Sequence, residues 1–225
     1  MNVLVVAAHP DDEVLGAGAT MAAHARAGDR VTVAILGEGI TSRHSARADA
    51  DSRALEALRA DALRAGSILG CADVRLFDLP DNRFDSVDLL DVVKIVEGVV
   101  HEVEPAIVYT HFRGDLNVDH TVTARAVLTA CRPLPGSSVR RILAFEVPSA
   151  TGWGFPDQAF SPTVFVDAQN TLALKLEAMR GYGSEVRPYP HPRAPEALAE
   201  RAKSWGTQVG LSAAEPFVLL REIIR

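Results

Sequence analysis

Residues 3–13 read VLVVAAHPDDE, an apolar run that ends in one histidine and three carboxylates. The apolar part, residues 3–8, is typical of a buried strand in a parallel sheet. The loop that leaves the carboxyl end of such a strand is where open α/β folds build their sites. A histidine nitrogen and an aspartate oxygen both bind zinc, but a catalytic zinc site needs three protein ligands and an open position. The third ligand must therefore come from elsewhere in the chain.

A second polar segment, GDLNVDH at residues 114–120, follows another apolar run at residues 106–109. Its alternating oxygen side chains are similar to the first half of a calcium-binding EF-hand loop. That loop requires Gly at position six and Glu at position twelve, where this chain has His120 and Ala126. The segment is therefore not an EF-hand, and His120 is available as the third metal ligand. Asp119 is expected to orient a partner of the site or to begin the following helix.

These two segments resemble the two motifs of the LmbE-like (PIG-L) N-deacetylases, zinc enzymes that remove an acyl group from an amino sugar or a related amine. The resemblance implies that His9, Asp12 and His120 hold one divalent metal, Zn²⁺, and that Asp11 is the general base. It extends along most of the chain and includes three further places: Arg59, the stretch LPDNRFD at residues 79–85, and HPR at residues 191–193.

Asn117 departs from the common form of this family, in which a histidine stands three residues before the last metal-binding histidine. An asparagine amide can donate a hydrogen bond to an oxyanion, but it cannot deliver a proton near pH 7. The sequence therefore leaves more than one candidate for the general acid. Asp11 could return the proton that it removed, or His191 or His111 could supply one.

Arginines are natural partners for a charged substrate, because the planar guanidinium binds carboxylate and phosphate groups through two hydrogen bonds. By resemblance, Arg59 is the substrate-contacting arginine at the head of its helix. Arg193 is a further candidate from its motif, and Arg83 fits a solvated surface charge equally well. Glu13 and Asp119, from the two metal motifs, complete the set of candidate substrate-binding residues.

Apolar strand-like runs alternate with helical patterns along the first two thirds of the chain, which favours a mostly parallel sheet with helices on both faces. The fold class predicted is α/β, a Rossmann-like three-layer sandwich, in a single domain of residues 1–225. The predicted strands are residues 3–8, 31–36, 74–77, 106–109, 141–147, 163–166 and 216–220. The predicted helices are residues 15–27, 46–69, 87–103, 121–130, 169–180 and 195–209, with long loops at residues 148–162 and 187–195.

The stretch GAGATM, residues 16–21, is similar to a dinucleotide-binding fingerprint, but Met21 stands where the third glycine is required. The stretch also follows the metal motif instead of the strand end. Gly16 and Gly18 are therefore expected to let a helix pack closely against the sheet.

The composition excludes several classes of protein. A net charge of −6 over 225 residues, with interspersed Lys and Arg, argues against a broad nucleic-acid surface. No basic leader precedes the first apolar run, and that run is far shorter than the ~20 residues of a membrane span. A soluble, cytoplasmic protein is expected, and a homo-oligomer is compatible with the sequence. Cys71 and Cys131 are expected to be buried thiols, because two cysteines make no disulfide framework.

The sequence therefore predicts a zinc-dependent hydrolase that removes an N-acetyl or other N-acyl group from an amino sugar or a sugar conjugate. Two other functions use the same residue types. A metal-dependent phosphoester hydrolase would also need carboxylates and arginines, although phosphoryl transfer usually recruits oxygen-rich magnesium or two-metal sites. A non-catalytic sugar-binding module could keep a structural zinc, but such a site is normally closed by four ligands.

Overall fold

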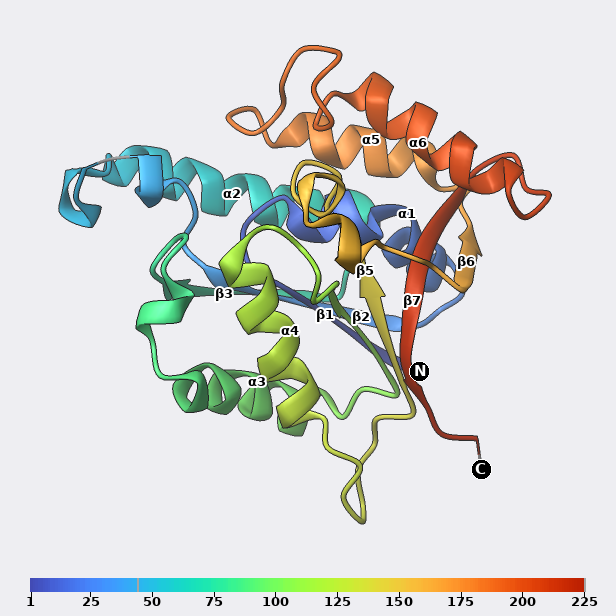
Figure 1. Ribbon diagram of the computed structural model, residues 1–225, viewed down its shortest axis with the longest axis horizontal. Helices are drawn as coiled ribbons and strands as arrows, with labels where there is room; N and C mark the ends of the chain where they lie inside the picture. The colour runs from blue at the N-terminus through green and yellow to red at the C-terminus, as the bar shows by residue number, and fades with distance from the viewer. Residues whose placement is uncertain (44, 225) are drawn as a thin grey trace.

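The computed structural model describes residues 1–43 and 45–224, which form a seven-stranded sheet (Figure 1). Five strands run parallel in the order β3-β2-β1-β4-β5, and β7 lies antiparallel between β5 and β6. The bounds are β1 (Asn2–Ala7), β2 (Arg30–Gly37), β3 (Asp73–Leu79), β4 (Ile107–His111), β5 (Arg141–Phe145), β6 (Val164–Asp167) and β7 (Ala214–Glu222).

Helices cover both faces of the sheet, which confirms the predicted Rossmann-like three-layer sandwich. In Figure 1, α1, α2, α5 and α6 lie on one face and α3 and α4 on the other. The helices are α1 (Asp12–Arg26), α2 (Ser52–Leu69), α3 (Leu89–Val103), α4 (Val118–Ala130), α5 (Leu172–Gly181) and α6 (Pro195–Thr207). None of the helices in the described residues is long and apolar enough to cross a membrane.

The central strand β1 supplies both hydrophobic cores, because its side chains alternate between the two faces. Val3, Val5 and Ala7 belong to the core under α1, α2 and α5. The intervening Leu4 and Val6 belong to the core under α3 and α4. All five side chains are fully buried, so the strand is apolar throughout, as expected for a parallel sheet covered on both sides.

Five of the six helices begin at different residues from those predicted, among them α3 at Leu89 instead of residue 87 and α5 at Leu172 instead of residue 169. The predicted helix 46–69 begins only at Ser52, because the Asp51 side chain accepts a hydrogen bond from the Arg53 N–H and caps it. Residues 47–49 form a separate 3₁₀ turn. The first helix begins at Asp12 instead of Leu15, and α4 begins at Val118 instead of residue 121. One predicted metal ligand therefore lies in the first turn of each of these two helices, Asp12 in α1 and His120 in α4.

Gly16 seats α1 against the sheet. A Cβ atom at this position would lie 2.2 Å from Cδ2 of Phe145 on β5, which no packed side chain tolerates. A Cβ atom at Gly18 would lie 3.0 Å from Cγ of Lys175. The expected close packing against the sheet is confirmed for Gly16, whereas Gly18 faces Lys175 on α5 and not the sheet.

A kink interrupts α1 just beyond the glycine, where Ala17 has φ −138° and ψ 16°. A buried ion pair satisfies the backbone groups that the kink frees. Lys175 donates to the Leu15 carbonyl at 2.8 Å and to Glu215 at 2.6 Å. Glu215 in turn accepts from the backbone N–H groups of residues 19–20. These charges are therefore structural and lie apart from the metal motif.

The two cysteines are free thiols, Cys131 buried and Cys71 only half-buried. Burial raises the pKa of each thiol to about 12. Both thiols are therefore protonated at neutral pH, and the expectation of a buried thiol is confirmed for Cys131 but is wrong for Cys71.

The strand order determines where the site lies. Strands are added outward from β1 to β3 on one side and from β4 on the other, so the strand order reverses between β1 and β4. Open α/β folds bind ligands at such a point, at the carboxyl ends of the strands. The loop after β1 carries His9, and α4, which follows β4, carries His120. The topology thus brings together two motifs that are more than 100 residues apart in the sequence.

Candidate metal centre and active site

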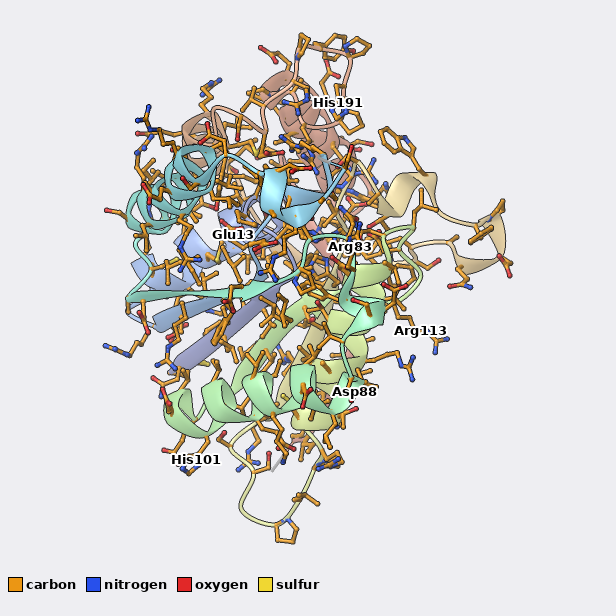
Figure 2. The ribbon with its side chains drawn as sticks, turned by 90° about the vertical axis from the view of Figure 1, so that its left-hand side faces the viewer. Glu13, Arg83, Asp88, His101, Arg113 and His191 are labelled. Atoms are coloured by element: carbon orange, nitrogen blue, oxygen red, sulfur yellow. The ribbon has the colours of Figure 1, made fainter. Side chains whose placement is uncertain are left out.

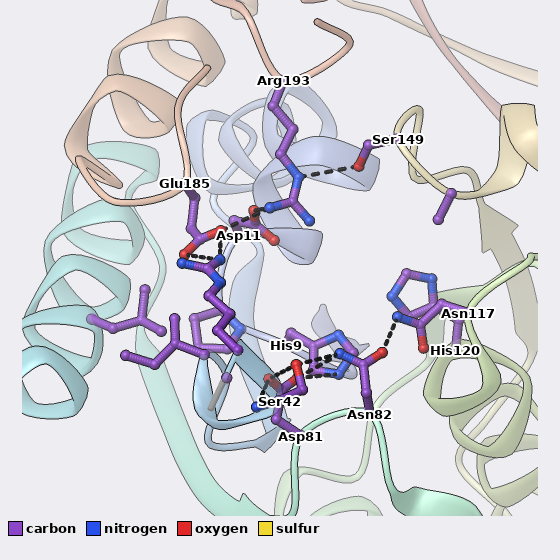
Figure 3. A pocket seen from close by; sticks show the side chains of 16 residues that line it. His9, Asp11, Ser42, Asp81, Asn82, Asn117, His120, Ser149, Glu185 and Arg193 are labelled. Carbon is purple, nitrogen blue, oxygen red and sulfur yellow. Dashed lines mark hydrogen bonds and ion pairs between the residues drawn. The ribbon is translucent and has the colours of Figure 1, made fainter. Parts of the chain in front are cut away.

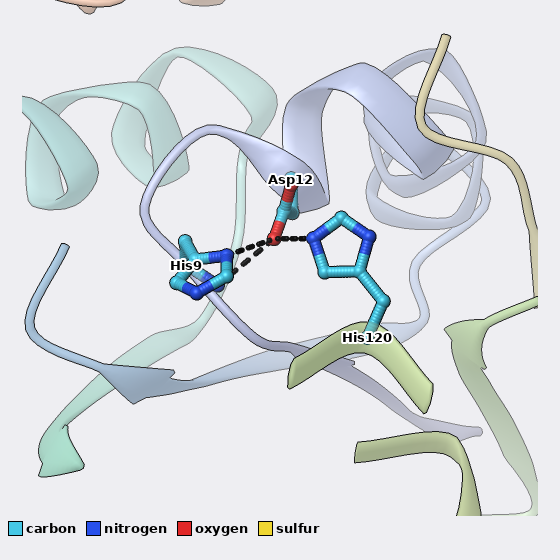
Figure 4. Close-up of side chains that lie close together, drawn as sticks. All are labelled: His9, Asp12 and His120. Atoms are coloured by element: carbon cyan, nitrogen blue, oxygen red, sulfur yellow. Dashed lines mark hydrogen bonds and ion pairs between the residues drawn. The ribbon is translucent and has the colours of Figure 1, made fainter. Parts of the chain in front are cut away.

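His9, Asp12 and His120 converge on one point, as the sequence predicted (Figure 4). Oδ2 of Asp12 lies 3.2 Å from Nδ1 of His9 and 3.1 Å from Nε2 of His120. One ligand atom from each residue lies within 4.8 Å of the other two. Two imidazole nitrogens and one carboxylate oxygen form a donor set typical of a catalytic zinc site. The residues present therefore fit a single divalent ion.

The outer nitrogen of His9 faces two further carboxylates. Its Nε2 lies 2.8 Å from Oδ2 of Asp119 and 3.3 Å from Oδ1 of Asp81. The other oxygen of Asp119 accepts a hydrogen bond from the Phe84 N–H at 2.9 Å. A proton on Nε2 leaves the lone pair of Nδ1 free for the metal, so these carboxylates orient His9. Asp119 is fully buried and does not line the cavity described below.

His120 is held in the same manner from the opposite side. Its Nδ1 lies 3.1 Å from Oδ1 of Asp115, a carboxylate from the same motif. This contact is an ion pair without hydrogen-bond geometry, because the buried Nδ1 has no hydrogen-bond partner among the described residues, and it leaves Nε2 facing Asp12. Each histidine thus uses one nitrogen for the metal and the other for a carboxylate, which is the usual arrangement around protein-bound zinc.

His111 lies beneath the ring of His120, stacked at a centroid distance of 4.0 Å and fully buried. Its Nε2 accepts a hydrogen bond from the Ala8 N–H at 2.8 Å, so this nitrogen carries no proton. Burial and the neighbouring charge of His120 lower the pKa of His111 well below its ordinary value. A neutral ring that accepts from the backbone and lines no cavity cannot deliver a proton to a substrate. We therefore do not assign His111 as the general acid.

The surrounding carboxylates favour protons on the two metal-binding histidines when no metal is bound. Burial disfavours the charged form of His9, but hydrogen bonds to Asp119 and Asp12 outweigh it and raise its pKa to about 10. Burial also disfavours the charged form of His120, but the contacts with Asp12 and Asp115 outweigh it and raise its pKa to about 9. Without a metal, both rings are positively charged at pH 7.5, with a proton on each nitrogen. A metal must displace one proton from each ring to bind.

We expect zinc binding at pH 7.5 to release about two protons per ion, one from each of the two histidines. The measurement is isothermal titration calorimetry of the metal-free protein in buffers of different ionisation enthalpy. The slope of the observed enthalpy against buffer enthalpy gives the number of protons. A slope near zero would show that the histidines are already neutral, contrary to the charge distribution described here.

Asp11 adjoins the metal ligands, and its backbone adopts a left-handed conformation with φ 104°. Such a conformation costs a residue other than glycine about 1–3 kcal/mol and persists only where neighbours enforce it. Glu13 enforces it here, because its Oε2 accepts from the Asp11 N–H at 3.1 Å. Tyr182 at the end of α5 donates to the other oxygen of Glu13 at 2.5 Å. The carboxylate of Asp11 is thus turned toward the cavity beside the metal ligands.

The metal ligands open into a polar cavity of about 150 Å³ (Figure 3). His9, His120 and Asp11 form its floor. Residues of the loops after β2, β3 and β5 and of the loop between α5 and α6 form its walls. The wall residues are Gly39, Ile40, Ser42, Arg43, Asp81, Asn82, Ser149, Ala150, Glu185 and Arg193, joined by Pro10, Leu58 and Asn117.

Arg193 reaches from the loop before α6 to the predicted general base (Figure 3). Its Nη1 lies 3.2 Å from Oδ2 of Asp11 and donates to Glu185 at 2.7 Å. Its Nε donates to Oγ of Ser149 at 3.1 Å. Burial raises the pKa of Asp11 well above its ordinary value, and the positive charge of Arg193 opposes that shift. Arg193 therefore both orients the Asp11 carboxylate and favours its ionised form.

Asn117 lies at the cavity wall and caps α4. Its side-chain oxygen accepts from the Asp119 N–H at 2.8 Å, and its Nδ2 donates to Asn82 at 2.9 Å. An amide nitrogen carries two protons, so one remains for a substrate oxygen. Asn117 can therefore take the predicted role of a hydrogen-bond donor to an oxyanion.

Four other predicted site residues lie outside the lining of this cavity. Arg59 donates to the Leu76 carbonyl of β3 at 3.4 Å. Arg83 is exposed, whereas Glu13 is buried (Figure 2). His191 lies near the outer surface, where its Nδ1 accepts from the Arg193 N–H at 3.1 Å (Figure 2).

Sequence reasoning missed Arg43 and Glu185, which meet across the cavity. Arg43 donates to both oxygens of Glu185, at 2.8 and 2.7 Å. The two residues are 142 positions apart in the chain, and neither belongs to a recognisable motif. Asp81 and Asp115 had a signal, because both lie in motif segments, but their role as partners of the histidines depends on tertiary geometry.

Known proteins resemble this chain in sequence and in structure. It is 29% identical over 195 residues to YaiS of Escherichia coli, an uncharacterised deacetylase, with 81% of this chain and 91% of YaiS covered. It is 28% identical over 242 residues to the 1D-myo-inositol 2-acetamido-2-deoxy-alpha-D-glucopyranoside deacetylase of Thermomonospora curvata, with 82% and 80% covered.

The structure of GalB of Pseudomonas putida, a 4-carboxy-2-hydroxymuconate hydratase, superimposes with a TM-score of 0.76 and 23% identity. The superposition covers 100% of this chain and 98% of GalB. This likeness shows the fold alone, and proteins with this fold do not all catalyse one reaction. The family is shown by the sequence: residues 4–131 match the model described as PIG-L, GlcNAc-PI de-N-acetylase, and the chain belongs to that family.

Proposed function

We propose that this protein is a zinc-dependent amidohydrolase that removes the N-acetyl group from an amino sugar or a sugar conjugate. The observation that carries the proposal is the convergence of His9, Asp12 and His120 at the floor of a polar cavity, with Asp11 beside them. Membership of the de-N-acetylase family supports the reaction class, and the T. curvata relative is named for an acetamido sugar substrate.

The metal, when bound, supplies a Lewis acid for the amide carbonyl and acidifies a water molecule. Asp11 is placed to accept the proton of the attacking water, and it can return this proton to the departing amine. Asn117 donates a hydrogen bond toward the oxygen that becomes negatively charged. Arg193 holds Asp11 in position through the whole cycle. We therefore propose Arg193, and not Arg59, as the functional arginine of the site.

The charges of the cavity favour an uncharged sugar over a phosphate ester. Among the described lining residues the two arginines, Arg43 and Arg193, are both paired with Glu185. Asp11 and Asp81 add further negative charge. A dianionic phosphate would meet these carboxylates without an unpaired guanidinium to balance them. Ser42 and Asn82 instead offer neutral donors and acceptors, and Asp81 offers acceptor oxygens, all of which suit sugar hydroxyls.

A structural zinc in a non-catalytic module would not explain Asp11. The described ligands number three, and a structural site is normally closed by four. A strained, buried carboxylate that is held by Glu13 and Arg193 has no purpose in such a module. Strain of this kind is typical of a catalytic position.

Mass spectrometry of the zinc-loaded enzyme with a panel of substrates tests the proposal. The panel contains N-acetylglucosamine, its nucleotide-diphosphate form, thiol-linked N-acetylglucosaminides and a phosphate monoester. We expect loss of one acetyl group from at least one N-acetyl sugar and no hydrolysis of the phosphate monoester. Phosphate release without deacetylation would contradict the proposal.

We expect His191→Ala to change turnover by less than the ~10²-fold typical of a lost general acid. The ring lies outside the cavity lining and accepts a backbone hydrogen bond, so it supports the loop that carries Arg193. The measurement is turnover against pH for the variant and the wild type, with zinc content determined on the same samples. A loss of 10²-fold or more, with zinc retained and the basic limb of the profile removed, would make His191 the acid.

A further inference from the structure

We propose that Thr151 is a positioning residue for the metal centre, which holds the Asp115 carboxylate in place and, through it, directs Nε2 of His120 at the metal. The inference rests on the metal site of the proposed function. Thr151 is buried and lies in the loop between β5 and β6, far in sequence from both metal motifs.

Two hydrogen bonds fix the direction of the Thr151 hydroxyl. Its oxygen accepts from the Val147 N–H at 2.8 Å, and it lies 2.5 Å from Oδ2 of Asp115. A threonine hydroxyl has a single proton. Since the Val147 N–H is itself a donor, the hydroxyl proton must point at Asp115. The backbone just after β5 thus sets the orientation of a side chain that contacts the second metal motif.

Asp115 accepts hydrogen bonds from two donors, and it also faces His120. Oδ2 accepts from Thr151, while Oδ1 accepts from the Asn117 N–H at 2.9 Å and faces Nδ1 of His120 at 3.1 Å. These contacts hold an ionised carboxylate in one orientation. Without Thr151 the carboxylate could rotate, and Nδ1 of His120 would lose the negative charge that faces it at 3.1 Å. A His120 ring that is oriented less firmly would bind the metal less tightly.

The same loop segment also forms a wall of the cavity. Ser149 and Ala150 line it, and Arg193 donates to the Ser149 hydroxyl. Thr151 follows directly after these residues. The cavity wall and the residue that positions Asp115 therefore belong to one short segment. A change in this wall would therefore be transmitted to the metal affinity.

Thr151→Val tests the proposal, because valine keeps the shape of the side chain and removes the hydroxyl. Partners outside the ligand shell typically affect metal affinity by 10- to 100-fold, and we expect a loss of ~10-fold for this residue. Affinity is measured by zinc competition with a chromophoric chelator. Long-range ¹H–¹⁵N spectra of the zinc-loaded proteins follow the Nδ1 proton of His120, which we expect to exchange faster in the valine variant.

Two further variants separate positioning from packing. Thr151→Ser restores the hydroxyl without the methyl group and should keep wild-type affinity and a protected Nδ1 proton. Thr123→Val is the matched control, since Thr123 is buried on the same helix as His120 and its hydroxyl has no partner in the described part of the chain. We expect this control to leave zinc affinity unchanged.

Wild-type affinity in Thr151→Val, or an equal loss in Thr151→Ser, would overturn the proposal. If the valine variant does not fold, Asp115→Asn takes its place, with a loss of at least ~10-fold expected and unchanged affinity contradicting the role. Failure of the metal site itself is recognised separately, because the wild-type protein would then bind no zinc, and both proposals would be wrong.

Discussion

Asp11→Asn is expected to lower turnover by ~10²- to 10⁴-fold, the usual contribution of a general base. The amide has nearly the same shape, but it cannot accept the proton of an attacking water molecule. Zinc affinity should stay close to that of the wild type, because Asp11 is not one of the three converging ligands. The measurement is turnover of the best substrate of the panel, with zinc quantified on the same preparation.

Asp88→Asn is the matched control for this substitution. Asp88 is exposed before α3, and its side chain makes no capping hydrogen bond (Figure 2). Its replacement should leave both turnover and zinc content unchanged. Wild-type turnover in Asp11→Asn, with zinc retained, would exclude the general-base role. Loss of zinc in this variant would instead make Asp11 part of the metal site.

His120→Ala is expected to lower zinc affinity by more than the ~100-fold that partners outside the ligand shell can cause, because one of three direct ligands is lost. Turnover should fall to the level of the chelator-treated wild type. Elemental analysis after dialysis against a weak chelator gives the zinc content.

His101→Ala is a suitable control, because this histidine is exposed on α3 and lies away from the metal ligands (Figure 2). We expect it to keep full zinc stoichiometry. If His120→Ala also kept one zinc per chain, the ligand assignment would be wrong.

The fold could be predicted from the sequence because its signals are local. The run at residues 3–8 is apolar on both faces, and only a central parallel strand requires this pattern. Element boundaries were less accessible. The start of α2 depends on which of several polar residues caps it, and Asp51 does so only once the preceding residues have formed their own turn.

The convergence of His9, Asp12 and His120 could also be predicted, because each motif lies at the end of an apolar strand. The walls of the cavity could not. Arg59 belongs to a helix in a family-like context, yet its guanidinium contacts the backbone of β3. Arg43 and Glu185 come from separate loops whose meeting depends on how α5 packs across α2. No periodicity or spacing in the sequence records such a contact.

The central claim is tested most directly by measuring acetate and free amine from an N-acetylglucosamine conjugate in one experiment with four samples. The samples are the zinc-loaded wild type, the wild type stripped with a chelator, the stripped enzyme reloaded with zinc, and zinc-loaded Asp11→Asn. We predict equal amounts of acetate and amine from the loaded and reloaded enzyme, and little of either from the other two. Equal release from the stripped enzyme and from Asp11→Asn would contradict a metal-dependent deacetylase that works through this site.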